Sequence, residues 1–79
     1  MSYRKKALKF HLKKCVICGI CNPLDVHHIN ENHRDNSEEN LCFLCPTHHQ
    51  DLHRNNNQEI REIIMDYRDE FIANYFNLF

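Results

Sequence analysis

The segment that decides the fold runs from residue 15 to residue 54 and reads CVICGICNPLDVHHINENHRDNSEENLCFLCPTHHQDLHR. It contains two pairs of candidate metal ligands, Cys15 with Cys18 and Cys45 with His48, and each pair has the same two-residue gap. Three thiolates and one imidazole form the closed tetrahedral set that is typical of structural zinc. We expect these four side chains to bind one zinc ion, which would contribute roughly 10–16 kcal/mol of apparent binding free energy to folding.

Two further cysteines leave the ligand set open. Cys21 repeats the two-residue gap after Cys18, and Cys42 stands in the same gap before Cys45, so either could replace a ligand. We expect both to be small buried or semi-exposed residues.

The size and cysteine content of the chain favour a metal over a disulfide framework. A chain of 79 residues is enough for one domain, but its core is too small to be stabilised by burial alone. The cysteine count is odd, and the charged N-terminus carries no secretory signal, so we expect a cytoplasmic protein with reduced thiols. No apolar run approaches membrane-spanning length, so we expect no membrane partner.

Short elements are predicted on both sides of the two cysteine turns. The stretch after Pro46 contains no helix-breaking residue and is therefore predicted to be a helix. Leu8 and Leu12 lie four residues apart on a basic segment, which predicts a second helix there. We expect His11 of the basic segment at the surface. In chain order we expect a helix over Tyr3–Lys13, a tight turn over Cys15–Pro23, a strand over Leu24–Ile29, a polar loop over Asn30–Asn40, a strand over Leu41–Leu44 and a helix over Thr47–Arg54.

The last segment, residues 58–79, has the clearest helical periodicity. Its apolar residues recur mostly three and four apart and predict one broad stripe on a long amphipathic helix. We expect this stripe to cover the metal core; the alternative is a homodimer or partner-protein interface, because the stripe is wide. The stripe comprises Ile60, Ile63, Ile64, Tyr67, Phe71, Ile72, Tyr75, Phe76 and Phe79.

Several polar residues have no role in the zinc set. They are the pair His27–His28 at the end of the first strand, Asn40 before the second, and His49 with His53. Residues at positions i and i+4 face the same side of a helix, so His49 and His53 can reach one ion. Because only histidines serve this second site, it would keep open positions, as metal-activated hydrolysis requires.

Taken in order, these residues resemble a known family. The string Asp25-Val26-His27-His28-Ile29, Asn40-Leu41 and Leu44-Cys45-x-x-His48-His49-x-x-x-His53 is similar to the HNH endonucleases in their ββα-metal (His-Me finger) form. The resemblance covers Cys15 to Arg54, half of the chain, and departs from the family where His48 stands in place of a final cysteine. It implies a single small α+β zinc-stabilised domain, with a ββα-metal core over 15–54 between a basic helix over 1–14 and the helix over 58–79.

The resemblance also implies an activity and residue roles. His28 corresponds to the general base, with an unperturbed pKa near neutrality. His27, His49 and His53 correspond to ligands of a divalent cation, which could be Mg²⁺, Mn²⁺, Ni²⁺ or Zn²⁺. Asn40 corresponds to the central asparagine that pins the loop and aims the base. The implied reaction is hydrolysis or nicking of DNA with 5′-phosphate and 3′-hydroxyl ends, as in short nucleases of phages and mobile elements.

Two weaker assignments concern the surroundings of the histidines. Asp25 could orient a metal-bound imidazole from outside the ligand set. Asn36 could assist the loop geometry or could be an ordinary turn residue.

The charge distribution bears on the partner. The net charge is −1, yet residues 1–14 carry six cations and no acid, which suits contact with phosphate as well as a solvated basic helix. No element reads as a dedicated recognition helix. The alternative to an enzyme is a non-catalytic zinc module that binds nucleic acid or a partner protein. Candidate contacts to DNA are Arg4, Lys5, Lys6, Lys9, Lys13, Lys14 and Arg34.

Overall fold

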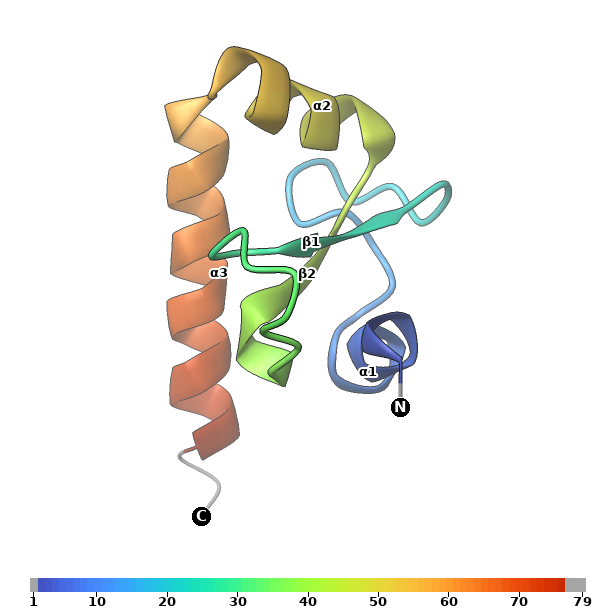
Figure 1. The fold of residues 1–79 in the computed structure, drawn as a ribbon, viewed down its shortest axis with the longest axis vertical. Coiled ribbons are helices and arrows are strands. Elements are labelled where there is room, and N and C mark those ends of the chain that lie inside the picture. Colours follow the sequence, from blue (N-terminus) through green and yellow to red (C-terminus); the bar gives the residue numbers. More distant parts are fainter. Residues whose placement is uncertain (1, 77–79) are drawn as a thin grey trace.

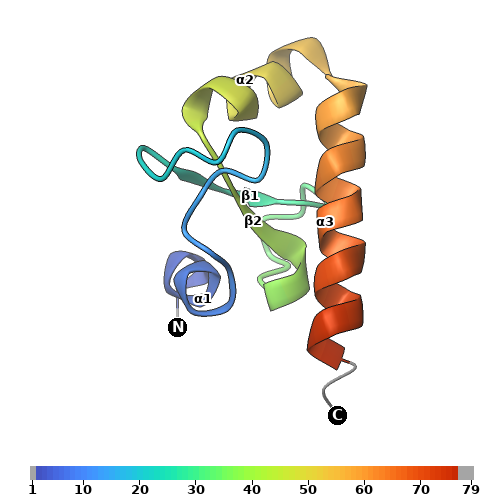
Figure 2. The same cartoon turned by 180° about the vertical axis from the view of Figure 1, so that it is seen from behind.

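The computed structural model describes residues 2–76 and shows an α+β arrangement. A two-stranded antiparallel sheet lies between α1 on one side and α3 on the other, and α2 crosses one end (Figures 1 and 2). Phe79, the last member of the predicted apolar stripe, lies outside the described residues. In chain order the elements are α1 (Tyr3–Phe10), β1 (Asp25–His28), the 3₁₀ turn η1 (Glu38–Asn40), β2 (Leu41–Leu44), α2 (Pro46–Asn55) and α3 (Gln58–Phe76).

The sheet is short, and its second strand forms the centre of the core. Asp25 pairs with Leu44 and His28 pairs with Leu41, so the histidine pair lies opposite the first half of β2. All four residues of β2 are buried, because α1 contacts the strand and residues of α3 join the same apolar cluster. The segment before β2 was expected to be loop throughout, but its last three residues form η1.

Helix α1 is shorter than predicted. Ser2 caps its first residue, Tyr3, with a hydroxyl that accepts a hydrogen bond from the backbone N–H of Lys5, and the helix ends at Phe10, so Lys13 and Lys14 lie beyond it. Ala7 is fully buried, whereas Leu8 and Leu12 are 48% and 74% exposed. A small side chain lets the helix backbone approach the sheet closely, so the buried face of α1 contains Ala7 and not Leu8.

His11 is also buried, contrary to expectation. Its ring stacks on Phe71, its Nε2 lies 2.7 Å from the carbonyl oxygen of Glu38, and its Nδ1 lies 2.5 Å from the hydroxyl of Tyr67. This histidine connects the end of α1 to η1 and to α3. Both ring nitrogens have partners, which explains how a polar ring can occupy this position.

Helices α2 and α3 are joined by a sharp turn, so that α2 lies across the end of α3 (Figure 1). The Cys45 sulfur caps α2, Pro46 is its first residue, and Asn56 ends it in the left-handed conformation. Along α3, Ile60 and Ile64 are buried but Ile63 is 43% exposed, so the buried stripe is narrower than the periodicity predicted. Within residues 2–76, no helix is long and apolar enough to cross a membrane.

Candidate metal centres

The first cluster joins the turn after α1 to the start of α2. Cys15, Cys18, Cys45 and His48 each offer one ligand atom, and these atoms all lie within 4.8 Å of one another. The Cys18 and Cys45 sulfurs are 3.9 Å apart. The Nδ1 of His48 lies 3.1 Å from the Cys45 sulfur and 3.9 Å from the Cys15 sulfur.

These distances fit a tetrahedral zinc ion. Zn–S bonds of about 2.3 Å and Zn–N bonds of about 2.0–2.1 Å imply S···S and S···N edges of about 3.8 Å and 3.6 Å. The observed S···S distance is close to the first value, and the two S···N distances lie on either side of the second. Gly19, at φ 79°, closes the turn by donating its N–H to the Cys15 carbonyl, which brings Cys18 back beside Cys15.

The two alternative cysteines lie outside this cluster, within the described part of the chain. Burial raises the pKa of the Cys42 thiol to about 12, which disfavours the thiolate that a metal requires. For Cys15, burial raises the pKa, but N–H groups of Cys18, Cys45 and Ile17 outweigh it and bring the pKa to about 6. Cys42 is buried, as expected, whereas Cys21 is exposed rather than buried or semi-exposed.

The second cluster joins β1 to the solvent-facing side of α2. The ligand atoms of His27, His49 and His53 also lie within 4.8 Å of one another. The Nε2 atoms of His49 and His53 are 3.1 Å apart, and two imidazole nitrogens on one tetrahedral ion would be separated by about 3.3 Å. The three rings thus fit a single cation and leave further coordination positions for other ligands.

The surroundings keep His27 neutral and orient the ring of His49. Burial first, and then the neighbouring His49 and His53 rings, lower the pKa of His27 to about 4, so it is unprotonated at neutral pH. The Nδ1 of His49 lies 3.2 Å from the Asp25 carboxylate. A proton on that Nδ1 leaves the lone pair of Nε2 directed at the cluster, which is the common second contact of a metal-bound histidine.

His28 lines the same cavity as the three histidines. The cavity has a volume of about 90 Å³ and is also lined by Glu31 and His33. The His28 ring lies between Tyr3 and His33, with ring centroids 5.1 and 5.0 Å away. Its Nε2 is 2.7 Å from the side-chain oxygen of Asn36. His28 is 4% exposed, so these contacts leave it little freedom to rotate.

Asn40 holds the loop that carries Asn36. Its side-chain NH₂ donates to the Asn30 side-chain oxygen at 2.9 Å and to the Asp35 carbonyl at 2.8 Å. Its own side-chain oxygen accepts the backbone N–H of Asn30 at 3.0 Å. The buried amide therefore closes the loop between β1 and η1 by three hydrogen bonds.

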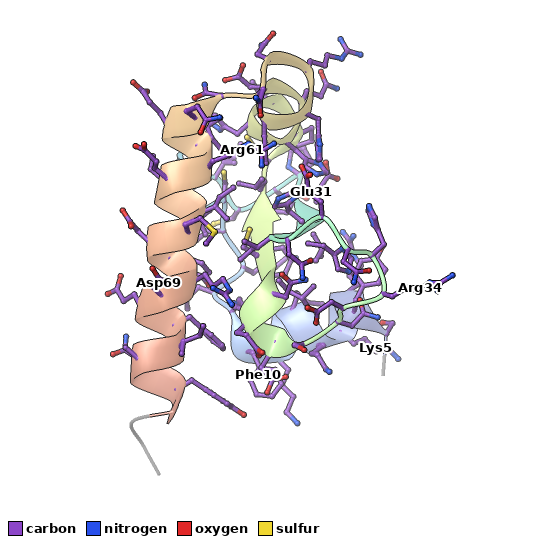
Figure 3. The ribbon with its side chains drawn as sticks, turned by 60° about the vertical axis from the view of Figure 1, so that its left-hand side comes forward. Lys5, Phe10, Glu31, Arg34, Arg61 and Asp69 are labelled. Carbon is purple, nitrogen blue, oxygen red and sulfur yellow. The ribbon has the colours of Figure 1, made fainter. Side chains whose placement is uncertain are left out.

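The predicted basic residues do not all face solvent freely. Arg4 donates to the Leu24 carbonyl at 3.2 Å, and Lys6 lies 4.0 Å from the Glu38 carboxylate. Lys5 and Arg34 project from the same side of the molecule (Figure 3). The exposed members of the set are Arg4, Lys5, Lys9, Lys13, Lys14 and Arg34.

Sequence reasoning missed Glu31 and Arg61, which lie beside the histidine cluster. Glu31 follows β1 in the left-handed conformation, and Arg61 belongs to the first turns of α3. No motif marks either residue, and their proximity depends on the path of the loop.

No protein-family model, curated protein or solved structure matches this chain.

Proposed function

We propose that this protein is a metal-dependent endonuclease of the HNH type with a ββα-metal core, which hydrolyses phosphodiester bonds of DNA. The observation that carries the proposal is the single cavity that His28 shares with His27, His49 and His53. Three convergent imidazoles suit a cation with open positions, and a fourth imidazole beside them suits a general base.

In this proposal His28 takes a proton from the attacking water. The Asn36 side-chain oxygen can only accept a hydrogen bond, so the Nε2 of His28 carries the hydrogen and Nδ1 keeps its lone pair. Asn40 supports this arrangement indirectly, because it closes the loop from which Asn36 projects. Its role is to position the base rather than to contact the phosphate.

The other histidines would hold the cation. A divalent ion bound by His27, His49 and His53 supplies Lewis-acid stabilisation of charge on the scissile phosphate and the leaving oxygen. Asp25 keeps the Nε2 of His49 directed inward, and the burial of His27 keeps that ring neutral. Zinc at Cys15, Cys18, Cys45 and His48 would serve the fold instead, because these four ligands fill a tetrahedron.

Exposed cations near the cavity support DNA as the substrate. Lys5 and Arg34 lie on one side of the molecule (Figure 3). Tyr3, two residues before Lys5, and His33, next to Arg34, both contact the His28 ring. Phosphate groups of a bound strand would be attracted to this side through counterion release.

A plasmid-relaxation assay tests the proposal. The purified zinc-containing protein is incubated with supercoiled plasmid and Mg²⁺, Mn²⁺, Ni²⁺ or Zn²⁺, beside His28→Ala and His33→Ala. We expect metal-dependent nicking that falls by about 10²–10⁴-fold in His28→Ala, the usual contribution of a general base. His33→Ala removes a neighbouring imidazole and should retain most of the activity. Absence of nicking with every ion, at full zinc content, would favour a non-catalytic zinc module.

A further inference from the structure

Glu31 connects the histidine cluster to α3. Its Oε1 atom lies 4.0 Å from the Nδ1 of His53 and 3.4 Å from an Nη atom of Arg61. Figure 3 shows Arg61 on the side of α3 that faces Glu31, whereas Asp69 points to the opposite side. A guanidinium group is thus separated from a candidate metal ligand by one carboxylate.

The position of Arg61 is fixed from a second direction. Its Nε donates to the side-chain oxygen of Asn56 at 2.9 Å. Asn56 lies at the end of α2 in the left-handed conformation that is common at helix ends, and Glu31 follows β1 with a φ of 63°. Two residues from separate segments thus contact the same guanidinium.

Arg61 also borders the site through His27. The arginine and His27 line a small cavity of about 80 Å³. His27 lines the adjacent cavity as well, together with Glu31 and His53. The Arg61 side chain remains 34% exposed, so it is partly open to solvent.

We propose that Arg61 binds a phosphodiester group of the nucleic acid beside the histidine site, and that Glu31 holds the guanidinium there in the free protein. Guanidinium forks bind phosphate oxygens with two parallel hydrogen bonds. The half-exposed Glu31–Arg61 pair is weak, so a phosphodiester at the cation can take over one edge of the guanidinium. Helix α3 then contributes directly to substrate binding. The inference rests on the proposed function, since a phosphodiester must come to this site.

The competing explanation is that the Glu31–Arg61 pair only ties the loop to α3. Arg68 offers a matched control on the same helix, two turns further on. Its side chain is 36% exposed and lies 3.9 Å from the Asp69 carboxylate, so its exposure and pairing resemble those of Arg61. It does not border the histidine cavity.

The test measures binding of a short fluorescein-labelled DNA duplex by fluorescence anisotropy over a salt series. All proteins carry His28→Ala to prevent cleavage and are loaded with zinc and Ni²⁺. Arg61→Ala should weaken binding about tenfold or more, because it removes charged hydrogen bonds. The slope of log affinity against log salt should shrink by about one, as expected for one lost phosphate contact. Arg68→Ala should leave both quantities unchanged.

Two further variants keep the test decisive. Arg61→Lys retains the charge, and should therefore keep the salt slope while it recovers only part of the affinity. Glu31→Gln releases Arg61 and should bind DNA as tightly as the parent or more tightly. If the Glu31–Arg61 ion pair only connected the loop to α3, Glu31→Gln would weaken DNA binding as much as Arg61→Ala. That result, or equal behaviour of Arg61→Ala and Arg68→Ala, would overturn the inference.

This test and the nicking assay can fail independently. If the parent protein never nicks plasmid, but Arg61→Ala lowers DNA affinity and the salt slope, the Arg61 proposal stands and the nuclease proposal is refuted. If the parent nicks plasmid, but Arg61→Ala changes neither affinity nor slope, the nuclease proposal stands and the Arg61 proposal is refuted. Zinc content and the melting temperature are measured for every variant. If Arg61→Ala fails to fold, Arg61→Lys and Glu31→Gln decide.

Discussion

The Nε2 of His28 lies 2.7 Å from the side-chain oxygen of Asn36. Because an amide oxygen has no proton to donate, this contact requires a hydrogen on Nε2. In the neutral ring the lone pair is then on Nδ1, and the ring cannot flip without losing the bond. Asn36 thus selects one tautomer of His28 although it belongs to a loop without regular structure.

Replacement of Asn36 should slow nicking without weakening DNA binding. Asn36→Ala removes the acceptor, and we expect kcat to fall about 10–100-fold, the range found when outer partners of catalytic groups are lost. Asn36→Asp keeps an oxygen acceptor and should recover part of the rate. Imidazole ¹⁵N shifts of His28 give a readout independent of activity: the Nε2–H form should dominate in the parent and in Asn36→Asp only. Asn32→Ala, in the same loop, is the control; an unchanged His28 tautomer in Asn36→Ala would contradict the assignment.

Local spacing explains what could be predicted of the sites. The two-residue gap between Cys15 and Cys18 and the i, i+4 relation of His49 and His53 are set by one turn of backbone. Such ligands converge wherever the turn and the helix form. Cys45 was also predictable from the local sequence, because it directly precedes the proline that starts α2. The structure brings these residues together as the spacing requires.

Contacts that depend on close packing or on a loop path could not be predicted. Leu8 with Leu12 and Ala7 with His11 have the same four-residue spacing, so periodicity could not choose between them. The smaller pair is buried because α1 lies close to the sheet. Glu31 and Arg61 are thirty positions apart, and no pattern relates them.

Zinc binding should distinguish Cys18 from Cys21. Both thiols are exposed, so their replacement costs similar packing, but only Cys18 belongs to the ligand cluster. Cys18→Ser should lose zinc and unfold at a much lower temperature, because the bound ion supplies roughly 10–16 kcal/mol of apparent free energy. Cys21→Ser should keep the parent zinc content, measured by atomic emission, and the parent melting temperature. Loss of zinc from Cys21→Ser instead would require a different ligand set.

Asp25 should control the affinity of the histidine site for metal. Its carboxylate lies 3.2 Å from the Nδ1 of His49, and Asp25→Asn removes the negative charge that makes this ring a stronger ligand. We expect the affinity for Ni²⁺, titrated calorimetrically into the zinc-loaded protein, to fall about 10–100-fold. Asp69→Asn, on the outer side of α3, provides the control (Figure 3). Equal affinities of the two variants would show that Asp25 does not orient His49.

His11 should make the stability of the fold depend on pH. Burial lowers the pKa of His11 below its ordinary value of 6.5, against the opposing effects of the Glu38 carbonyl and carboxylate. Between the lowered pKa and 6.5, the unfolded chain binds more protons than the folded one, so stability rises with pH. The contribution is complete above pH 6.5 and is lost as the pH falls through the folded pKa.

His11→Leu should therefore cost stability at neutral pH and flatten this dependence. At pH about 7.5 the variant leaves the Tyr67 hydroxyl and the Glu38 carbonyl without their partner, a loss of about 1–3 kcal/mol. Towards pH about 5 the difference from the parent should shrink, because the parent must then protonate a buried ring or unfold. Urea denaturation of the two zinc-loaded proteins measures this difference, and the pH dependence of the zinc site cancels because both proteins share it. A difference in unfolding free energy that stays constant over this pH range would show that His11 does not titrate with folding.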